Sequence, residues 1–183
     1  MRIILGITGA SGIIYALRLI EELKKRGCEI YAIITEYGKK IMEHEMGMDE
    51  KELRKKVDVL YHENEMESSL ASGSFDHDAM IVVPCSIKTL GSIASGIPSN
   101  LLTRAAMCSL KEGKKLILVL RETPLDLISL ENMVKAKKAG VIILPAMPAF
   151  YHKPKDMDGI INYVVGKILE QMGIEHNLYK KWG

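Results

Sequence analysis

The chain has 183 residues, of which 48% are hydrophobic and 26% charged, so it is long enough to form one domain (1–183) with a sizeable core. Its formal net charge of +2 gives no reason to expect a nucleic acid or a membrane surface as partner. Three scattered cysteines and five histidines without metal-ligand spacing argue against a disulfide framework and a metal site, and predict a cytoplasmic protein.

The first predicted strand, residues 2–6, ends in the glycine-rich turn GITGASG (6–12), which leads into a helix. Thr8 and Ser11 place hydroxyls beside the start of that helix, where backbone N–H groups and the helix dipole favour an anion. The spacing G-x-x-G-x-x-G differs from the G-x-G-x-x-G of dinucleotide-binding proteins, so NAD is not favoured. The same glycines interrupt the apolar N-terminal stretch, which therefore does not predict a signal peptide.

The next part of the chain is less regular. A strand over 29–35 ends at Thr35 and is followed by a predicted helix over 36–46. The segment 49–61 fits either a charged helix or a strand, and both alternatives stay open. The polar segment 62–77 is long for a connection inside a domain, so we expect it to be functional or disordered.

The apolar run at 79–83 predicts a strand buried on both faces of a parallel sheet. Pro84 is expected to end this strand, because proline cannot donate to a ladder. Ser86, Lys88 and Thr89 coincide with the start of the next helix, where free N–H groups and hydroxyls come together. A single N-cap serine would be the simpler interpretation, but two such turns in one chain favour an anion-binding site.

The remaining chain continues the alternation of helices and strands. Ser99 is expected to cap a helix that runs to Glu112. Thr123 as N-cap and Pro124 at the first helical position predict another helix, which ends near residue 139. Three further elements are expected: strands over 115–120 and 141–144, and an amphipathic helix over 158–172.

This alternation predicts an α/β sandwich with a mostly parallel sheet and right-handed crossovers. In such sheets, ligands bind in the crevice at the carboxyl ends of the strands. Ser11, Thr35, Ser86 and Arg121 each follow a predicted strand. We therefore expect these four side chains to face one crevice.

Short motifs occur in a characteristic order along nearly the whole chain. The most specific are RETPL at 121–125 and ILPAMPAFYH at 143–152. The others are GITGASG at 6–12, ASGSF at 71–75, PCSIKTL at 84–90, SNLLTRAA at 99–106, LKEGKKL at 110–116, LENM at 130–133 and GIEHNL at 173–178. Together they resemble the flavin prenyltransferases (UbiX-type, also known as phenylacrylic acid decarboxylase-like). The resemblance implies a Rossmann-like three-layer sandwich and a homo-oligomer, usually a dodecamer, with the active site at a subunit interface.

Enzymes of that family join the dimethylallyl group of dimethylallyl phosphate to N5 and C6 of reduced FMN. The product, prenylated FMN, is the cofactor of UbiD-type decarboxylases. The resemblance implies FMN as the bound flavin and no metal, and the chain indeed has no D-D-x-x-D-like acidic cluster. It implies that FMN is bound by Gly9, Ala10, Ser11, Thr35, Ser86, Ile87, Lys88, Thr89 and Arg121.

The resemblance also assigns the residues of the transfer reaction. Cationic and phenolic donors are suited to a departing phosphate, on which negative charge develops. Dimethylallyl phosphate is thus expected to meet Tyr151 and Lys167, with Arg104 and Lys111 adding positive charge. The implied catalytic residues are Ser11, Glu45 and Glu122, with Ser11 tied to proton traffic at N5 and Glu122 acting as a proton relay.

Each of these residues also fits a purely structural role. Lys167 on an amphipathic helix is typical of a surface lysine, and Glu122 of an acid in the first turn of a helix. The chain departs from the family pattern at Leu120, at Met107-Cys108 and at Met66, which concern the prenyl pocket and no polar catalytic position.

Two other functions stay open on the sequence. The first is an FMN-dependent cysteine decarboxylase of the related family, which carries a PASANT-like motif and a catalytic histidine in its N-terminal half. This chain has PCSIKT at the corresponding place and no histidine before His44. The second is a non-catalytic FMN carrier or accessory subunit of a decarboxylase.

Overall fold

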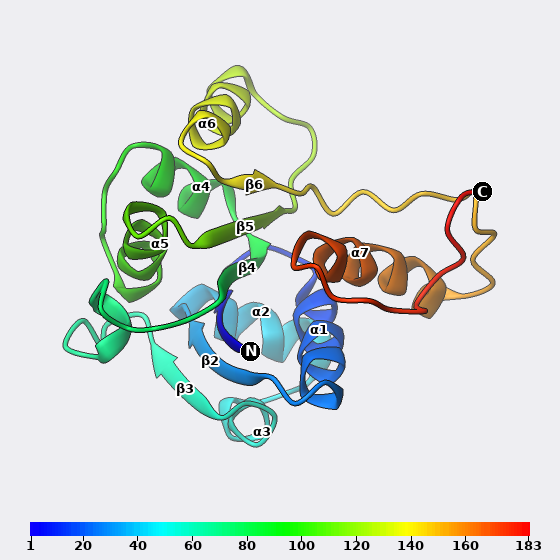
Figure 1. Cartoon of the computed structure of the whole chain (residues 1–183), viewed down its shortest axis with the longest axis horizontal. Coiled ribbons are helices and arrows are strands. Elements are labelled where there is room, and N and C mark those ends of the chain that lie inside the picture. Colours follow the sequence, from blue (N-terminus) through cyan, green and yellow to red (C-terminus); the bar gives the residue numbers. More distant parts are fainter.

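A six-stranded sheet forms the centre of the computed structural model, which describes residues 1–183 (Figure 1). All neighbouring strands run parallel. In the order in which they lie side by side, they are β3 (Val59–His62), β2 (Glu29–Ile34), β1 (Arg2–Ile7), β4 (Ala79–Cys85), β5 (Lys115–Leu120) and β6 (Ile142–Ile143). The predicted Rossmann-like α/β class is confirmed, with a sheet that is wholly rather than mostly parallel.

Two hydrophobic cores cover the two faces of the sheet, because alternate strand residues point to opposite sides. Ile3 and Leu5 of β1 belong to one core, and Ile4 to the other. The first core is covered by α1 (Ile13–Lys25), α2 (Glu36–Met46) and α7 (Met157–Gln171). The second is covered by α4 (Ile87–Ala94), α5 (Leu101–Lys111) and α6 (Leu127–Lys138).

The segment 49–61, for which the sequence left helix and strand open, contains both. A short helix, α3 (Glu50–Arg54), begins after Asp49, whose carboxylate accepts from the N–H of Glu52 at 2.9 Å. Strand β3 follows it. The polar segment 62–77 is ordered and includes a 3-10 turn, η1 (Ser69–Ala71).

Strand β4 continues past Pro84 to Cys85, so the prediction that Pro84 ends the strand was wrong. The register with β5 shifts just before Cys85, and such an irregularity accommodates a residue that cannot donate to the ladder. The carbonyl of Pro84 accepts from the N–H and the hydroxyl of Thr8, at 3.3 and 2.7 Å. This contact joins the ends of β1 and β4.

Two helix starts also differ from the prediction, because a better-placed acceptor caps each helix. Asn100, not Ser99, caps α5, and its Oδ1 accepts from the N–H of Thr103 at 2.9 Å. Asp126, not Thr123, caps α6, and its carboxylate accepts from the N–H and hydroxyl of the residue three positions on. Carboxylate and amide oxygens are at least as effective at this position as hydroxyls.

The C-terminal arm, residues 145–183, leaves the sheet after β6 and runs to the right in Figure 1. Helix α7 returns from there and packs on α1, and the final tail follows α7 outward again. No helix of the protein is both long enough and apolar enough to span a bilayer.

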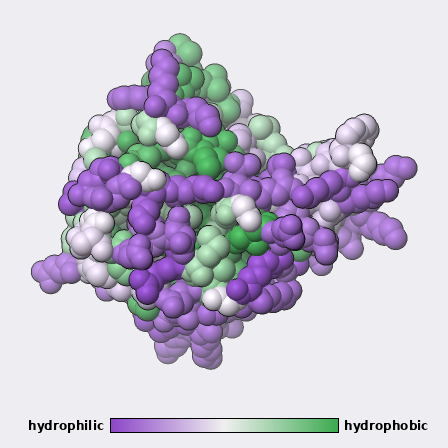
Figure 2. All heavy atoms as spheres, viewed as in Figure 1, coloured by the Kyte–Doolittle hydropathy of each residue, from purple (hydrophilic) through white to green (hydrophobic).

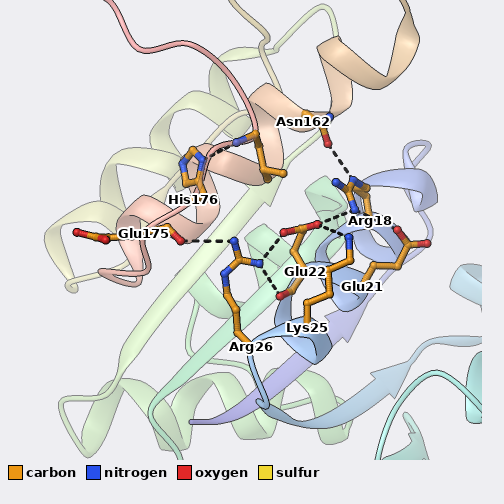
Figure 3. Close-up of polar contacts among 9 residues, drawn as sticks. Arg18, Glu21, Glu22, Lys25, Arg26, Asn162, Glu175 and His176 are labelled. Carbon is orange, nitrogen blue, oxygen red and sulfur yellow. Dashed lines mark hydrogen bonds and ion pairs between the residues drawn. The ribbon is translucent and has the colours of Figure 1, made fainter.

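A buried carboxylate, Glu22, pairs with the two arginines of α1 that contact this arm (Figure 3). Glu22 is only 4% exposed and pairs with Arg18 at 2.8 Å and Arg26 at 2.5 Å. Arg18 also donates from Nε to Asn162 Oδ1 of α7 at 2.8 Å, and Arg26 donates to the carbonyl of Glu175 in the tail at 3.4 Å. The two arginines thereby link α1 to both parts of the arm.

Candidate functional site

A polar cavity lies at the carboxyl ends of the central strands, where α2, α4 and α5 all begin. Backbone N–H groups in the first turn of a helix have no intrahelical acceptor, so the three helix starts supply donors and positive dipole ends to one place. The cavity is lined by Thr8, Gly9, Thr35, Tyr37, Glu63, Ser86, Lys88, Thr89, Ser92, Ser99, Asn100 and Thr103. Such a lining suits a phosphate and a hydroxylated chain.

The start of α4 contributes four of the nine residues predicted to bind FMN. The hydroxyl of Ser86 accepts from the N–H of Thr89 at 3.3 Å, and the two hydroxyls lie 3.1 Å apart. The N–H groups of Ile87 and Lys88 fall in the same first turn, beside the Lys88 side chain. Ser86 to Thr89 are therefore gathered at one helix start, as predicted.

Thr35 and Glu63 form another part of the wall. Thr35 caps α2 by accepting from the N–H of Gly38 at 3.0 Å. Glu63 was missed by the sequence interpretation, because it lies in a polar segment without periodicity. Its carboxylate accepts from the N–H of Glu36 at 2.7 Å and from Nδ2 of Asn100 at 2.6 Å. Glu63 therefore ties the starts of α2 and α5 together.

Thr8, in the first glycine turn, has a different role from the expected one. The Thr8 hydroxyl donates to the carbonyl of Pro84 and accepts from the N–H of Ser86 at 2.8 Å, so it connects the two turns at the wall of the cavity. Gly9 lines the cavity, and a Cβ atom there would lie 2.4 Å from Cβ of Tyr37. Ala10 is buried in the same turn. Gly9 is thus required by the approach of α2.

The start of α1, which was expected to face an anionic ligand, is occupied by the carboxylate of Glu45. This group accepts from the N–H of Gly12 at 3.0 Å and from that of Ile13 at 3.0 Å. Burial acts to raise the pKa of Glu45, but Ser11, the two N–H groups and the charge of Arg121 outweigh it and lower the pKa. Ser11, Glu45 and Arg121 are therefore one cluster.

Arg121 and Glu122 follow β5 and line a second, mostly apolar hollow. The N–H of Arg121 donates to the carbonyl of Cys85 at 3.4 Å, so this hollow adjoins the start of α4. The exposed carboxylate of Glu122 accepts from the N–H of Thr123 at 3.0 Å. The other lining residues are Leu120, Thr123, Leu125, Met133, Pro145, Ala146 and Met147.

The four residues expected to bind the substrate phosphate fall into two separate pairs. Arg104 and Lys111 lie on α5, where Nε of Arg104 donates to the carbonyl of Ala71 at 2.9 Å. Tyr151 and Lys167 lie in the C-terminal arm. Figure 1 places α5 and the arm at opposite ends of the molecule. A single chain therefore does not bring all four predicted residues together.

No group of three or more histidine, cysteine, aspartate or glutamate side chains has an arrangement that fits a metal ion.

Residues 1–169 match the family model described as Flavoprotein. A protein of Methanocaldococcus jannaschii named flavin prenyltransferase UbiX is 49% identical over 183 residues, which cover 100% of this chain and 99% of the relative. The solved structure of a dodecameric FMN-dependent UbiX-like decarboxylase from Escherichia coli O157:H7 has a TM-score of 0.97 and 38% identity, with 100% of both chains covered. The structure of AnUbiX (PadA1) in complex with FMN and dimethylallyl pyrophosphate also has a TM-score of 0.97, with 35% identity over 100% of this chain and 97% of that one.

Proposed function

Because the chain belongs to the UbiX flavin prenyltransferase family, we propose that it joins the dimethylallyl group of dimethylallyl phosphate to N5 and C6 of reduced FMN. The observation that carries this proposal is that the apolar hollow lies next to the polar cavity: Arg121 of the hollow donates its N–H to the carbonyl of Cys85, the residue before Ser86 of the cavity wall. A flavin mononucleotide has a phosphate, a hydroxylated chain and an apolar ring, and the two hollows supply matching surroundings in that order. The product serves UbiD-type decarboxylases.

Different residues of the flavin site are proposed to bind the phosphate and the ring of FMN. The start of α4 holds the phosphate with backbone N–H groups and hydroxyls, as helix starts commonly do. Arg121 lies against the first glycine turn and orients the ring end of the flavin. We assign flavin binding to Gly9, Ala10, Ser11, Thr35, Ser86, Ile87, Lys88, Thr89 and Arg121.

The transfer breaks the allylic C–O bond, whose electron pair leaves with the phosphate, and joins that carbon to N5, which loses its proton. A proton then adds to the double bond of the prenyl group, and the cationic carbon that results bonds to C6, which loses its proton in turn. Positive groups fixed around the departing phosphate stabilise the charge that develops on it, and a monophosphate carries little enough charge for side chains to replace a metal ion. We assign this role to Arg104, Lys111, Tyr151 and Lys167. The protons lost from the flavin are taken up by Ser11, held by Glu45, and by Glu122 in the apolar hollow.

A second copy of the chain completes the transfer site in this proposal, because one chain leaves Arg104 and Lys111 far from the arm. Exposed apolar side chains support such an assembly. Leu127, Ile128 and Val134 of α6 are more than half exposed, and Figure 2 shows hydrophobic atoms at this upper end of the molecule. The E. coli homologue named above is a dodecamer, and we propose the same for this chain.

The direct test is to incubate the protein with reduced FMN and dimethylallyl phosphate and to measure the mass of the released flavin. We expect a flavin heavier by one prenyl unit, formed equally well with a chelator present. A parallel reaction with dimethylallyl pyrophosphate determines which ester is preferred. An unchanged flavin would contradict the proposal, and carbon dioxide release from a peptidyl-cysteine would favour a cysteine decarboxylase instead.

A further inference from the structure

The carboxylate of Glu170 lies at the junction of α7 and the C-terminal tail and joins them. Its Oε2 accepts from Nζ of Lys167 at 2.6 Å. Its Oε1 accepts from the hydroxyl of Tyr179 at 2.6 Å. One oxygen thus faces the helix and the other faces the tail.

His176 adds a further contact from the tail. Its side chain is fully buried, and Nε2 lies 3.4 Å from Oε1 of Glu170. Its Nδ1 accepts from the N–H of Leu178 at 3.2 Å, so the neutral ring carries its hydrogen on Nε2, toward Glu170. Nε2 makes no hydrogen bond, so it lies beside the Glu170 carboxylate without bonding to it. The tail therefore fixes the orientation of the Glu170 carboxylate from two directions.

Glu170 and Lys167 are both ionised around neutral pH. Burial acts to raise the pKa of Glu170, but hydrogen bonds from Lys167 and Tyr179 lower it to about 2. The hydrogen bond to Glu170 raises the pKa of Lys167 above its ordinary value. The Lys167 ammonium has three N–H donors, and one of them is directed at Glu170.

We propose that Glu170 is the positioning residue for Lys167, and that the tail, through Tyr179 and His176, thereby sets the site of the substrate phosphate. The inference rests on the proposed role of Lys167 in binding dimethylallyl phosphate. An ordinary i,i+3 ion pair on a helix surface would not need a fixed carboxylate. Here the carboxylate is largely buried and has two tail partners, so the ammonium is directed to one place with two donors free for phosphate oxygens.

The test is Glu170→Gln, which keeps the size of the side chain and removes its charge. We expect the KM for dimethylallyl phosphate to rise on the order of tenfold, with kcat and the Kd for FMN little changed, because the contact is made before as well as during bond breaking. Glu21→Gln is the matched control. It removes the same charge from an exposed glutamate on α1 that pairs only with Arg18.

The pH dependence separates positioning from a general loss of structure. Glu170, Tyr151 and Tyr163 face Lys167 and hold its pKa up. Without Glu170, the ammonium should lose its proton at lower pH, so the KM of Glu170→Gln should climb earlier on the alkaline side than that of the wild type. A structural defect alone would not move this profile.

Tyr179→Phe provides a second variant with a smaller change. It should raise the same KM in the same direction, since it removes one of the contacts that fix the carboxylate. Calorimetric titration of dimethylallyl phosphate into FMN-loaded protein gives a readout independent of turnover. An active wild type whose KM and ester affinity are unchanged in both variants would overturn the role of Glu170. A wild type that forms no prenylated flavin would overturn the proposed function itself and this role with it.

Discussion

The polar cavity and the C-terminal arm are built in opposite ways. In the cavity, α2 and α4 begin directly after strands, and the capping contacts of all three helix starts join residues three positions apart, as between Ser86 and Thr89. The arm is held by side chains far apart in the sequence, such as Arg18 and Asn162. Local capping rules therefore determine the flavin site, whereas the position of the arm depends on long-range hydrogen bonds from the arginines of α1.

The two regions also differ in whether one chain holds all the residues of the proposed site. The residues proposed to bind the FMN phosphate lie around one cavity of one chain. The residues proposed to bind the substrate phosphate are divided between α5 and the arm. We therefore expect that a single chain can bind the flavin. Prenyl transfer, in contrast, should require the assembled oligomer.

The largest effect is expected at Glu122, which lies in the apolar hollow between the two regions. Glu122→Gln should lower kcat by roughly two orders of magnitude, because a positioned acid–base group is lost, and should leave the Kd for FMN unchanged. Steady-state kinetics and separate flavin titration measure both quantities. Glu131→Gln, an exposed charge change on α6, is the control. If Glu122→Gln turns over like the wild type, Glu122 has no catalytic role and serves the structure alone.

The next effect concerns the attachment of the arm. Burial acts to raise the pKa of Glu22, but Lys25, Arg26 and Arg18 lower it from 4.5 to about 2. A depressed folded-state pKa stabilises the protein above pH 4.5, and this contribution is lost as the pH falls from 4.5 to about 2. Glu22→Gln should lower the free energy of unfolding at pH 7 by roughly 2 kcal/mol.

Denaturant unfolding at several pH values checks this prediction. The difference between wild type and Glu22→Gln should be full at pH 7 and should shrink between pH 4.5 and about 2. A difference that is constant with pH would mean that the charge of Glu22 does not stabilise the folded protein. Flavin affinity should be the same in both proteins, since the cavity lies elsewhere.

The smallest effect is expected in the cavity. Ser86→Ala removes the N-cap of α4 and should cost about 1 kcal/mol of stability. It should weaken FMN binding several-fold, because one hydroxyl among several donors is lost, and should not change the KM for dimethylallyl phosphate at saturating FMN. Ser95→Ala, at the other end of α4, is the control. A changed KM for dimethylallyl phosphate would contradict the claim that the cavity and the arm bind different ligands independently.

Much of the sheet and of the flavin site was predictable, because strand ends and helix starts depend on neighbouring residues. The buried run of β4 and the hydroxyls of Ser86 and Thr89 follow from local composition. The prediction for Pro84 was wrong because a register shift, which depends on the neighbouring strand, carries β4 past it. Ser99 was replaced as a cap by Asn100, since both types fit the position and only the surrounding contacts decide.

The rest of the site depends on contacts that sequence spacing does not encode. Glu63 binds two helix starts from a segment without periodicity, and Glu45 reaches the first turn of α1 from the end of α2. The placement of α5 and α7 on opposite faces of the sheet likewise becomes apparent only in the folded chain. These features arise from tertiary packing.

The most direct test of the account is complementation between two defective chains. Arg104→Ala and Lys167→Ala should each be impaired in prenyl transfer and should each still bind FMN. When the two chains are co-expressed, about a quarter of the transfer sites in a statistical assembly should combine intact Arg104 from one chain with intact Lys167 from the other. We predict that prenylated FMN formation recovers to that extent. Mixed assemblies that form no more product than the separate variants would contradict a transfer site shared between chains.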